Sequence, residues 1–217
     1  PVLQTRSLQK RFGGIAATQD VSIALERGAR QALIGPNGAG KTTLFNCLSR
    51  LYIPSDGDIL FEGKSILKAR RHEIATIGMG RTFQNVALFD NMSVLDNVAL
   101  GAYLRGKAGV LRSAMRLDRV EEKRTHAEAA RAITRVGLAA HVHDAAGSLP
   151  LGRQRVVEIA RALAADPALL LLDEPAAGLN SQEADKLTEQ IRWLRDQFSL
   201  AVVLVEHNMR VVMGACE

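Results

Sequence analysis

Two short hydrophobic runs in the last third of the chain are separated by a stretch with helical spacing. Residues 168–172 read Ala-Leu-Leu-Leu-Leu, and residues 200–205 read Leu-Ala-Val-Val-Leu-Val. Both runs have the length and the near-continuous apolar composition of buried parallel strands. Residues 181–197 between them are amphipathic, and Asn180 can cap this predicted helix with Glu183 as its capping-box partner. The pattern predicts a βαβ unit with parallel strands and a right-handed crossover.

The N-terminal part of the chain contains further strand patterns. Residues 21–25 (Val-Ser-Ile-Ala-Leu) alternate as a half-buried strand does, and residues 57–63 read as a strand bounded by glycines. Residues 31–34 form a short apolar run, and residues 42–50 contain neither Gly nor Pro, so we expect a buried strand followed by a helix. The two outer strands predict an antiparallel sheet beside the core.

The middle of the chain is helical and strongly charged. Residues 70–77 predict a short helix, and residues 118–136 predict a long amphipathic helix closed by Gly137. A further helix is expected over residues 153–165, because Asp166-Pro167 would stop it there.

These elements predict a single α/β domain over residues 1–217. A core with its antiparallel subdomain would comprise residues 1–92 and 160–217, with an all-helical subdomain of about residues 93–159 inserted between them. No apolar stretch approaches the ~20 residues of a membrane span. The start of the chain does not resemble a signal peptide, and two cysteines favour a reducing cytosol.

The net charge of +5 is concentrated at residues 105–135, where nine Lys/Arg face four Asp/Glu. Such an excess can indicate nucleic acid or an anionic membrane as a partner. We interpret it as a solvated helical face, because the aromatic residues of a single-strand-binding platform are missing. We therefore expect no nucleic-acid partner.

Residues 35–43 carry the most informative motif, Gly-Pro-Asn-Gly-Ala-Gly-Lys-Thr-Thr, which fits the phosphate-binding pattern G-x-x-x-x-G-K-[ST]. In such loops glycines let successive backbone N–H groups surround a pyrophosphate, the lysine reaches the β- and γ-phosphates, and the hydroxyl after it binds Mg²⁺. The strand before the motif and the helix after it fit this interpretation. The candidate nucleotide-binding residues here are Gly35, Pro36, Asn37, Gly38, Ala39, Gly40, Lys41, Thr42 and Thr43.

Asp173 and Glu174 follow the apolar run 168–172 directly. A carboxylate at the end of a buried strand can bind the Mg²⁺ beside a phosphate loop, which suits Asp173. Glu174 could then polarise a water for attack on the γ-phosphate. The alternative, an N-terminal helix cap after a core strand, does not explain two adjacent carboxylates in a chain with a phosphate loop.

Three further candidates are ambiguous when each is considered alone. His207 follows a strand and could hold Glu174 and the attacking water, although a histidine there is usually structural or solvated. Gln84 lies where the core gives way to the helical region, and could reach Mg²⁺ or be an ordinary surface glutamine. Phe12 could stack on adenine or belong to the core.

Taken together, these motifs resemble those of an ABC transporter ATPase in their order and spacing, over nearly the whole chain. The run 78–98 is similar to the ATPase subunits of prokaryotic branched-chain amino-acid importers. The resemblance implies a P-loop NTPase core with an antiparallel β subdomain and an inserted α-helical subdomain. It also implies ATP and Mg²⁺ as cofactors and ATP hydrolysis as the activity.

The resemblance assigns a role to each matching residue. Phe12 would stack on adenine, Gly35 through Lys41 would bind the phosphates, and Thr42, Gln84 and Asp173 would bind Mg²⁺. Glu174 would be the catalytic base and His207 would sense the γ-phosphate. The family's signature loop contacts the ATP of a partner subunit, so the chain would act as a head-to-tail dimer. The residues placed at that shared site are Leu149, Gly152, Arg153 and Asn180.

The chain departs from the family pattern at the signature loop, which reads Leu149-Pro-Leu-Gly-Arg153 instead of Leu-Ser-Gly-Gly-Gln. The serine that would bind the γ-phosphate is missing, and we expect the Gly152 amide, the helix N-terminus and Arg153 to replace it. The alternative is that Arg153 points to solvent or pairs with Glu158. Asn180 replaces a usual aspartate, and the chain stops soon after His207, which implies a truncated C-terminal end.

The predicted partners are a second ATPase subunit, a transmembrane permease and, indirectly, a periplasmic solute-binding protein, at the cytoplasmic face of the plasma membrane. Coupling to the permease is expected near residues 84–95, where Val86 to Phe89 are apolar. Core packing of Leu88 and Phe89 is the alternative. A rival function is a non-transport ABC ATPase in DNA maintenance or translation. A regulator without turnover is disfavoured because Glu174 is intact.

Overall fold

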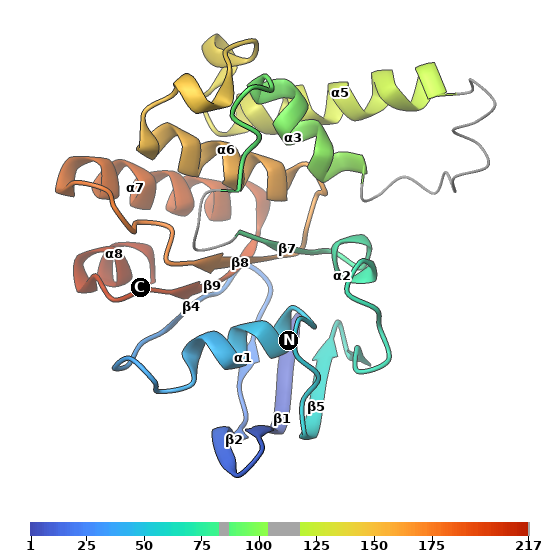
Figure 1. The fold of residues 1–217 in the computed structure, drawn as a ribbon, viewed down its shortest axis with the longest axis vertical. Helices are drawn as coiled ribbons and strands as arrows, with labels where there is room; N and C mark the ends of the chain where they lie inside the picture. Colours follow the sequence, from blue (N-terminus) through green and yellow to red (C-terminus); the bar gives the residue numbers. More distant parts are fainter. Residues whose placement is uncertain (83–86, 104–117, 217) are drawn as a thin grey trace.

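Two sheets and the helices around them make up the fold (Figure 1), and the computed structural model describes residues 1–82, 87–103 and 118–216. The strands are β1 (Leu3–Phe12), β2 (Ile15–Val21), β3 (Ala24–Leu25), β4 (Arg30–Leu33), β5 (Asp56–Phe61), β6 (Lys64–Ser65), β7 (Met79–Arg81), β8 (Leu169–Asp173) and β9 (Ala201–Val205). The helices are α1 (Lys41–Leu48), α2 (Glu73–Thr76), α3 (Val94–Tyr103), α5 (Asp118–Arg135), α6 (Leu151–Leu163), α7 (Ser181–Phe198) and α8 (Met209–Ala215), with two 3-10 turns at Ala139–His141 and Ala146–Ser148.

The parallel sheet has the strand order β4-β9-β8-β7. Asp173 at the end of β8 is level with Val205 at the end of β9, which is level with Leu33 of β4. The predicted βαβ unit of β8, α7 and β9 is therefore confirmed. Asn180 and Glu183 also form the predicted capping box at the start of α7, with the Glu183 amide donating to the Asn180 side chain.

The second sheet is antiparallel, with the order β2-β1-β5-β6 and β3 paired to β1. The predicted strand over residues 21–25 is wrong in part, because Val21 ends β2 and only Ala24 and Leu25 form β3. Strand β1 was not predicted from the sequence, because Ser7 within it adopts a left-handed conformation (φ 43°). This irregularity shifts the register against β5 and breaks the alternation of buried residues after Thr5.

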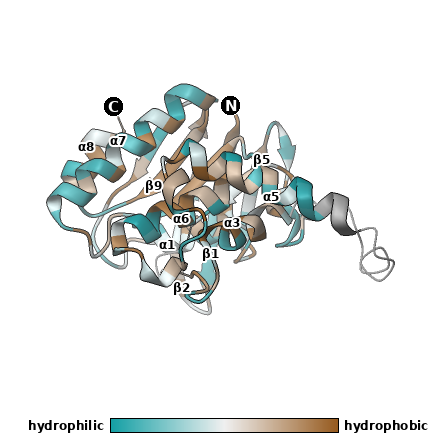
Figure 2. Ribbon diagram, turned by 90° about the horizontal axis from the view of Figure 1, so that it is seen from above, coloured by the Kyte–Doolittle hydropathy of each residue, from teal (hydrophilic) through white to brown (hydrophobic). Residues whose placement is uncertain are grey.

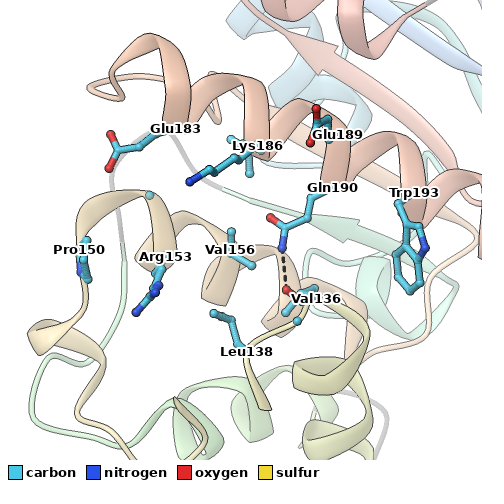
Figure 3. A pocket seen from close by; sticks show the side chains of 13 residues that line it. Val136, Leu138, Pro150, Arg153, Val156, Glu183, Lys186, Glu189, Gln190 and Trp193 are labelled. Carbon is cyan, nitrogen blue, oxygen red and sulfur yellow. Dashed lines mark hydrogen bonds between the residues drawn. The ribbon is translucent and has the colours of Figure 1, made fainter. Parts of the chain in front are cut away.

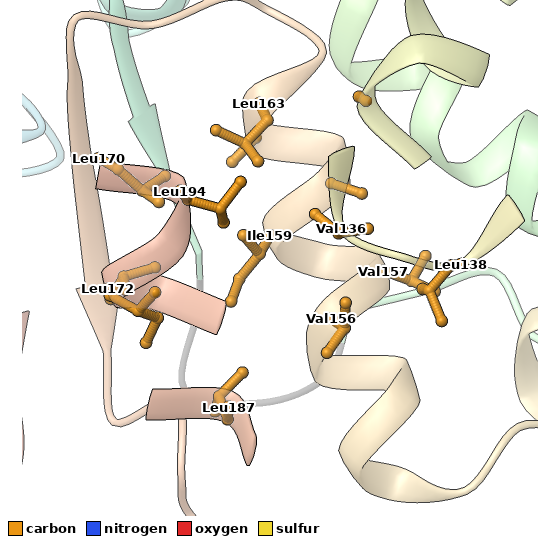
Figure 4. Packing of buried hydrophobic residues seen from close by; sticks show 14 of the residues in the cluster. Val136, Leu138, Val156, Val157, Ile159, Leu163, Leu170, Leu172, Leu187 and Leu194 are labelled. Atoms are coloured by element: carbon orange, nitrogen blue, oxygen red, sulfur yellow. The ribbon is translucent and has the colours of Figure 1, made fainter. Parts of the chain in front are cut away.

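Alternate residues of β8 and β9 face two separate hydrophobic cores. Leu169 and Leu171 pack with α1 and the antiparallel sheet, whereas Leu170 and Leu172 pack with α6 and α7. Figure 4 shows the second core, in which α6, with Ile159 and Leu163, lies between Leu170 and Leu172 of β8 on one side and Val136 and Leu138, which follow α5, on the other. Strands β8 and β9 are buried on both faces, which explains why they lack polar positions apart from Asp173 at the end of β8.

Helices α3, α5 and α6 pack against one another on the face of the parallel sheet opposite α1 (Figure 1). In Figure 2 the outer turns of α7 are mainly hydrophilic, whereas the central strands are hydrophobic. Strand β7 and helix α8 were not predicted, since three and seven residues are too few for a clear periodicity. None of the described helices is long and apolar enough to cross a membrane.

Candidate active site at the carboxyl edge of the parallel sheet

The four parallel strands end at one edge, and predicted site residues lie at the ends of β4, β8 and β9 or directly after them. The phosphate loop follows β4, His207 follows β9, Asp173 ends β8 with Glu174 next to it, and Thr82 follows β7. Ligands of open α/β sheets bind outside this carboxyl edge. Four segments that are far apart along the chain therefore meet at one candidate site.

The phosphate loop is exposed and bends tightly into α1. Gly38 and Gly40 have φ values of 81° and 85°, which disfavour any residue with a Cβ. A Cβ on Gly40 would lie 2.1 Å from the Ala17 carbonyl oxygen, so the loop also presses against β2. Helix α1 begins at Lys41, and its first amides face the loop. This geometry provides the N-terminal helix end and backbone amides that anions bind.

Lys41 reaches back across the loop. Its Nζ donates hydrogen bonds to the carbonyl oxygens of Gly35 at 2.7 Å and Pro36 at 2.8 Å. The ammonium group is thus held over the loop, where its positive charge would face the negative charge of a bound triphosphate. Thr42, next along α1, has an exposed side chain and presents its hydroxyl at the same helix end.

Asp173 is buried at the end of β8 and is paired with Arg81. Its Oδ2 lies 3.1 Å from Arg81 Nη2, and the two side chains are 6% and 10% exposed. Burial raises the pKa of the Asp173 carboxyl, although the Arg81 guanidinium opposes this shift. Arg81 also donates to Asn46 of α1 and to Ser49, which caps the C-terminal end of α1. Sequence reasoning missed Arg81, whose role depends on contacts with two other elements, β8 and α1.

Glu174 is held in a strained backbone conformation beside His207. Its φ of 47° lies in the left-handed region, which residues other than glycine rarely adopt. Its amide donates to the Val205 carbonyl oxygen at 2.9 Å, and His207 Nε2 lies 3.0 Å from Glu174 Oε1. The two side chains therefore share a hydrogen bond, while both remain partly exposed. Such strain is concentrated at functional sites.

Glu206, a second residue that sequence reasoning missed, fixes the loops around this pair. Its buried carboxylate accepts hydrogen bonds from the amides of Ala176, His207 and Asn208 at 3.0–3.2 Å. The turn after Glu174 and the turn that carries His207 are thus tied to one side chain. In the sequence, the one indication of a role for Glu206 was its position directly before His207.

The altered signature loop lies at the start of α6, beside a groove of about 660 Å³ between α6 and α7. Figure 3 shows Arg153, Lys186 and Glu183 at one end of this groove and Trp193 at the other. Glu158 instead binds Arg155 and Arg161, so the alternative pairing of Arg153 with Glu158 is wrong. Among the described residues no hydrogen bond or ion pair joins the Arg153 side chain to another group.

The remaining candidates differ in their exposure. Leu149 packs in the core, and only its backbone could contact a ligand. Asn180 is exposed while its side chain caps α7. Phe12 is 45% exposed in the β1–β2 hairpin and makes an edge contact with Tyr52, so its core alternative is wrong. Gln84 lies outside the described residues.

The oxygen donors at this edge fit Mg²⁺. The Thr42 hydroxyl and the Asp173 carboxylate are hard ligands, and Mg²⁺ commonly takes only one or two protein oxygens together with phosphates and water. Within the described ranges, no cluster of three or more His, Cys, Asp or Glu side chains could hold a metal ion. A shared site with nucleotide phosphates is therefore the arrangement these donors suit.

Comparisons with known proteins agree with this geometry. Residues 18–177 match the family model described as ABC transporter. The chain is 39% identical to the high-affinity branched-chain amino acid transport ATP-binding protein LivG of Escherichia coli, over 99% of this chain and 85% of the relative. It is 40% identical to BraF of Pseudomonas aeruginosa, described in the same words, with the same coverage. The crystal structure of an ATP-binding cassette of an ABC transporter in its ADP conformation superposes with a TM-score of 0.86 at 29% identity, over 99% of this chain and 84% of that one.

Proposed function

This chain belongs to the ABC transporter family, and we propose that it drives the import of branched-chain amino acids through a separate permease. As a member of this family it is an ATP-hydrolysing cassette with a P-loop NTPase fold. The substrate class rests on the names of the relatives LivG and BraF. All the relatives reported above serve transporters, which favours transport over DNA maintenance or translation.

The observation that carries the catalytic assignment is the hydrogen-bonded pair of Glu174 and His207 at the sheet edge that also holds the phosphate loop. In this proposal the loop amides and Lys41 bind the phosphates. Glu174 accepts a proton from the attacking water as general base. His207 orients the Glu174 carboxylate through their shared hydrogen bond and faces the γ-phosphate. Phe12 stacks on the adenine ring.

Mg²⁺ would be held by Thr42 and Asp173, with Gln84 as a third oxygen donor. When bound, the ion neutralises negative charge on the phosphates. Arg81 keeps the Asp173 carboxylate in place by its hydrogen bond at 3.1 Å. Arg81 on β7 would thus orient Asp173, the proposed Mg²⁺ ligand on β8.

We propose two shared sites in a head-to-tail dimer, where Gly152, Arg153 and Asn180 of one subunit contact the ATP of the other. Pro150 has no amide hydrogen or hydroxyl, so it cannot supply the missing contact to the γ-phosphate. Arg153 is exposed in the first turn of α6, and its charge has no partner among the described residues. A guanidinium beside a triphosphate would form a charge-assisted hydrogen bond.

The permease would dock between α2, α3 and β7, where a cavity of about 380 Å³ is lined by Ala75, Gly80, Ala87 and Leu100 among others. Phe89, which is 58% exposed, and Tyr103, which is 46% exposed, add apolar surface in the same part of the chain. The subunit would lie at the cytoplasmic face of the plasma membrane, bound to the permease. A periplasmic solute-binding protein would then act on the opposite side of the membrane.

Replacement of Glu174 by Gln tests the catalytic proposal. The amide cannot accept the proton of water, so turnover should fall by about 10²–10⁴-fold while ATP binding persists. Lys41→Ala should instead abolish ATP binding, and Glu189→Gln on the exposed face of α7 should change neither property. Turnover by Glu174→Gln at the parent rate would refute the role of this residue. The substrate is tested with the cognate permease in liposomes, where branched-chain amino acids and not sugars should stimulate ATP hydrolysis.

A further inference from the structure

A buried carboxylate lies between the two turns that carry Glu174 and His207. Glu206 directly follows β9 and is 4% exposed. Its Oε1 accepts a hydrogen bond from the Ala176 amide at 3.0 Å, in the turn after Glu174. Its Oε2 accepts from the amides of His207 at 3.0 Å and Asn208 at 3.2 Å. Each of the two turns is therefore held by a different oxygen of one side chain.

The turn after Glu174 depends on the end of β9 for its shape. Glu174 has a left-handed φ of 47°, and such a conformation persists only where the surroundings constrain it. The Glu174 amide donates to the Val205 carbonyl oxygen at 2.9 Å, and the Ala176 amide donates to Glu206. Two consecutive residues at the end of the neighbouring strand thus hold the strained residue in place.

The turn that carries His207 is bound to the same carboxylate and also to Glu174. The amides of His207 and Asn208 both donate to Glu206 Oε2. The His207 side chain reaches the other turn, where its Nε2 lies 3.0 Å from Glu174 Oε1. The contacts therefore close into a ring that runs from Glu206 through Ala176 and Glu174 to His207 and back.

A cap for the turn before α8 would need only one of the two oxygens of Glu206. Taking a carboxylate out of water is costly, and the three amide donors offset this cost. Oε1 adds nothing to the turn before α8, because it binds a turn that follows another strand. Its effect is to fix the segments after β8 and β9 relative to each other.

We propose that Glu206 is a positioning residue for ATP hydrolysis, which sets the hydrogen bond between Glu174 and His207 by binding one turn with each carboxylate oxygen. This inference rests on the proposed roles of Glu174 and His207 at the γ-phosphate. Glu206 acts through the backbones of the two turns and not on the nucleotide. Because the phosphate loop lies on another segment, between β4 and α1, loss of Glu206 should change turnover and leave ATP binding intact.

Glu206→Gln tests this role, because it keeps the shape of the side chain and replaces one oxygen by an NH₂ group that cannot accept a hydrogen bond. The kcat should fall by about tenfold to a hundredfold, since a misplacement of about 1 Å can cost up to about 10²-fold. The affinity for ATP, measured by equilibrium binding, should not change. A parent-like kcat, or a loss of ATP affinity as large as the loss of kcat, would overturn the proposal.

Thr5→Val separates this role from a general loss of stability. Thr5 is 1% exposed in β1, and its hydroxyl donates to the Val21 carbonyl oxygen at 2.8 Å and accepts from the Ile23 amide at 3.0 Å. The variant loses buried hydrogen bonds in the antiparallel sheet, so it should unfold at a lower urea concentration but keep the kcat of the parent. If the two variants lose stability and kcat to the same degree, Glu206 has only a structural role.

A spectroscopic readout needs no hydrolysis. The Nε2 resonance of His207, assigned by its absence in His207→Ala, should move in Glu206→Gln toward its position in Glu174→Ala, which lacks the hydrogen-bond acceptor. Glu206→Asp keeps the charge but is one methylene shorter, so it should give the same shift if Glu206→Gln does not fold. A His207 resonance that stays at the parent position would refute the proposal. If the parent chain does not hydrolyse ATP, the proposed function fails, while the shift still reports whether Glu206 sets this hydrogen bond.

Discussion

At the scale of single residues, the site depends on polar side chains whose partners are backbone groups or opposite charges. Lys41 binds two loop carbonyls, Glu206 accepts from three amides, and Asp173 is paired with Arg81. These contacts hold the turns around Glu174 and His207 before any nucleotide arrives. Preorganised groups of this kind are what electrostatic catalysis requires.

Arg153 lacks such a partner among the described residues, and this leads to a prediction about the dimer. Arg153→Ala should weaken ATP-driven dimerisation by about 1.5–3 kcal/mol, the usual contribution of a hydrogen bond to a charged group. ATP binding by the monomer should not change. Sedimentation velocity with ATP, in the Glu174→Gln background that should prevent hydrolysis, measures the effect.

Lys186→Ala provides the control, since Lys186 is an exposed cation that lines the same groove on α7. It should dimerise like the parent protein. Equal dimerisation of Arg153→Ala and the parent would show that the Gly152 amide and the helix N-terminus suffice.

At the scale of elements, α6 illustrates how function and stability compete. The helix buries Val157, Ile159 and Leu163 in the core, yet it also buries the carboxylate of Glu158. Burial raises the pKa of Glu158, and this effect outweighs the opposing effects of Ala87, Arg155 and Arg161. The folded protein therefore binds the Glu158 proton more tightly than the unfolded chain does.

This raised pKa predicts how the stability of a variant depends on pH. Below the ordinary glutamate pKa of about 4.3, Glu158 is protonated in both states and should match Gln in stability. As the pH rises through the raised pKa, the parent loses stability and Glu158→Gln does not. The difference should reach about 1.4 kcal/mol for each unit of the shift, in favour of the variant.

Urea unfolding of the two proteins between about pH 4 and pH 7 measures this difference. Glu189→Gln is again the matched control, because its side chain is exposed on α7. If Glu158→Gln loses stability relative to the parent as the pH rises, the ion pairs of Glu158 outweigh its burial.

At the scale of the whole molecule, the segment from Phe89 to Ser93 connects the sheet region to α3. Asn97, which is fully buried in α3, donates to the Phe89 carbonyl oxygen at 3.0 Å and accepts from the Phe89 amide at 2.8 Å. The backbone of Phe89 is thus fixed, while its side chain is 58% exposed. Core packing therefore accounts for the partly buried Leu88 and not for Phe89.

Phe89→Asp tests whether this exposed ring meets the permease. The ATPase activity of the isolated chain should remain within about twofold of the parent, and transport by the complete assembly should fall by about tenfold or more, as for an interface anchor. Met213→Asp on α8, where the side chain is 65% exposed, should leave both activities unchanged. A parallel loss of ATPase activity and transport would instead indicate a role of Phe89 in folding.

Local patterns in the sequence were sufficient to predict the family, the phosphate loop, the Asp173-Glu174 pair and the βαβ unit of β8, α7 and β9. Each of these is encoded within a few adjacent residues, by the spacing of glycines, by an apolar run followed by two acidic residues, or by a capping box. Strand β1 was missed because its irregularity at Ser7 disturbs the alternation. Strand β7 exists because it pairs with β8, which no three-residue pattern reveals.

Only the tertiary structure decided which side chains support the site. Arg81 meets Asp173 across 92 positions of sequence, and Ala87 meets Glu158 across 71. The order β4-β9-β8-β7 also depends on long-range pairing, and it brings the phosphate loop, His207, Glu174 and Thr82 to one edge. Local sequence fixes the conformation of nearby residues through backbone sterics and short-range hydrogen bonds. Contacts between distant segments arise only when the hydrophobic faces of the sheet are buried, and this burial put Arg81, Glu158 and Glu206 beside the loops of the candidate site.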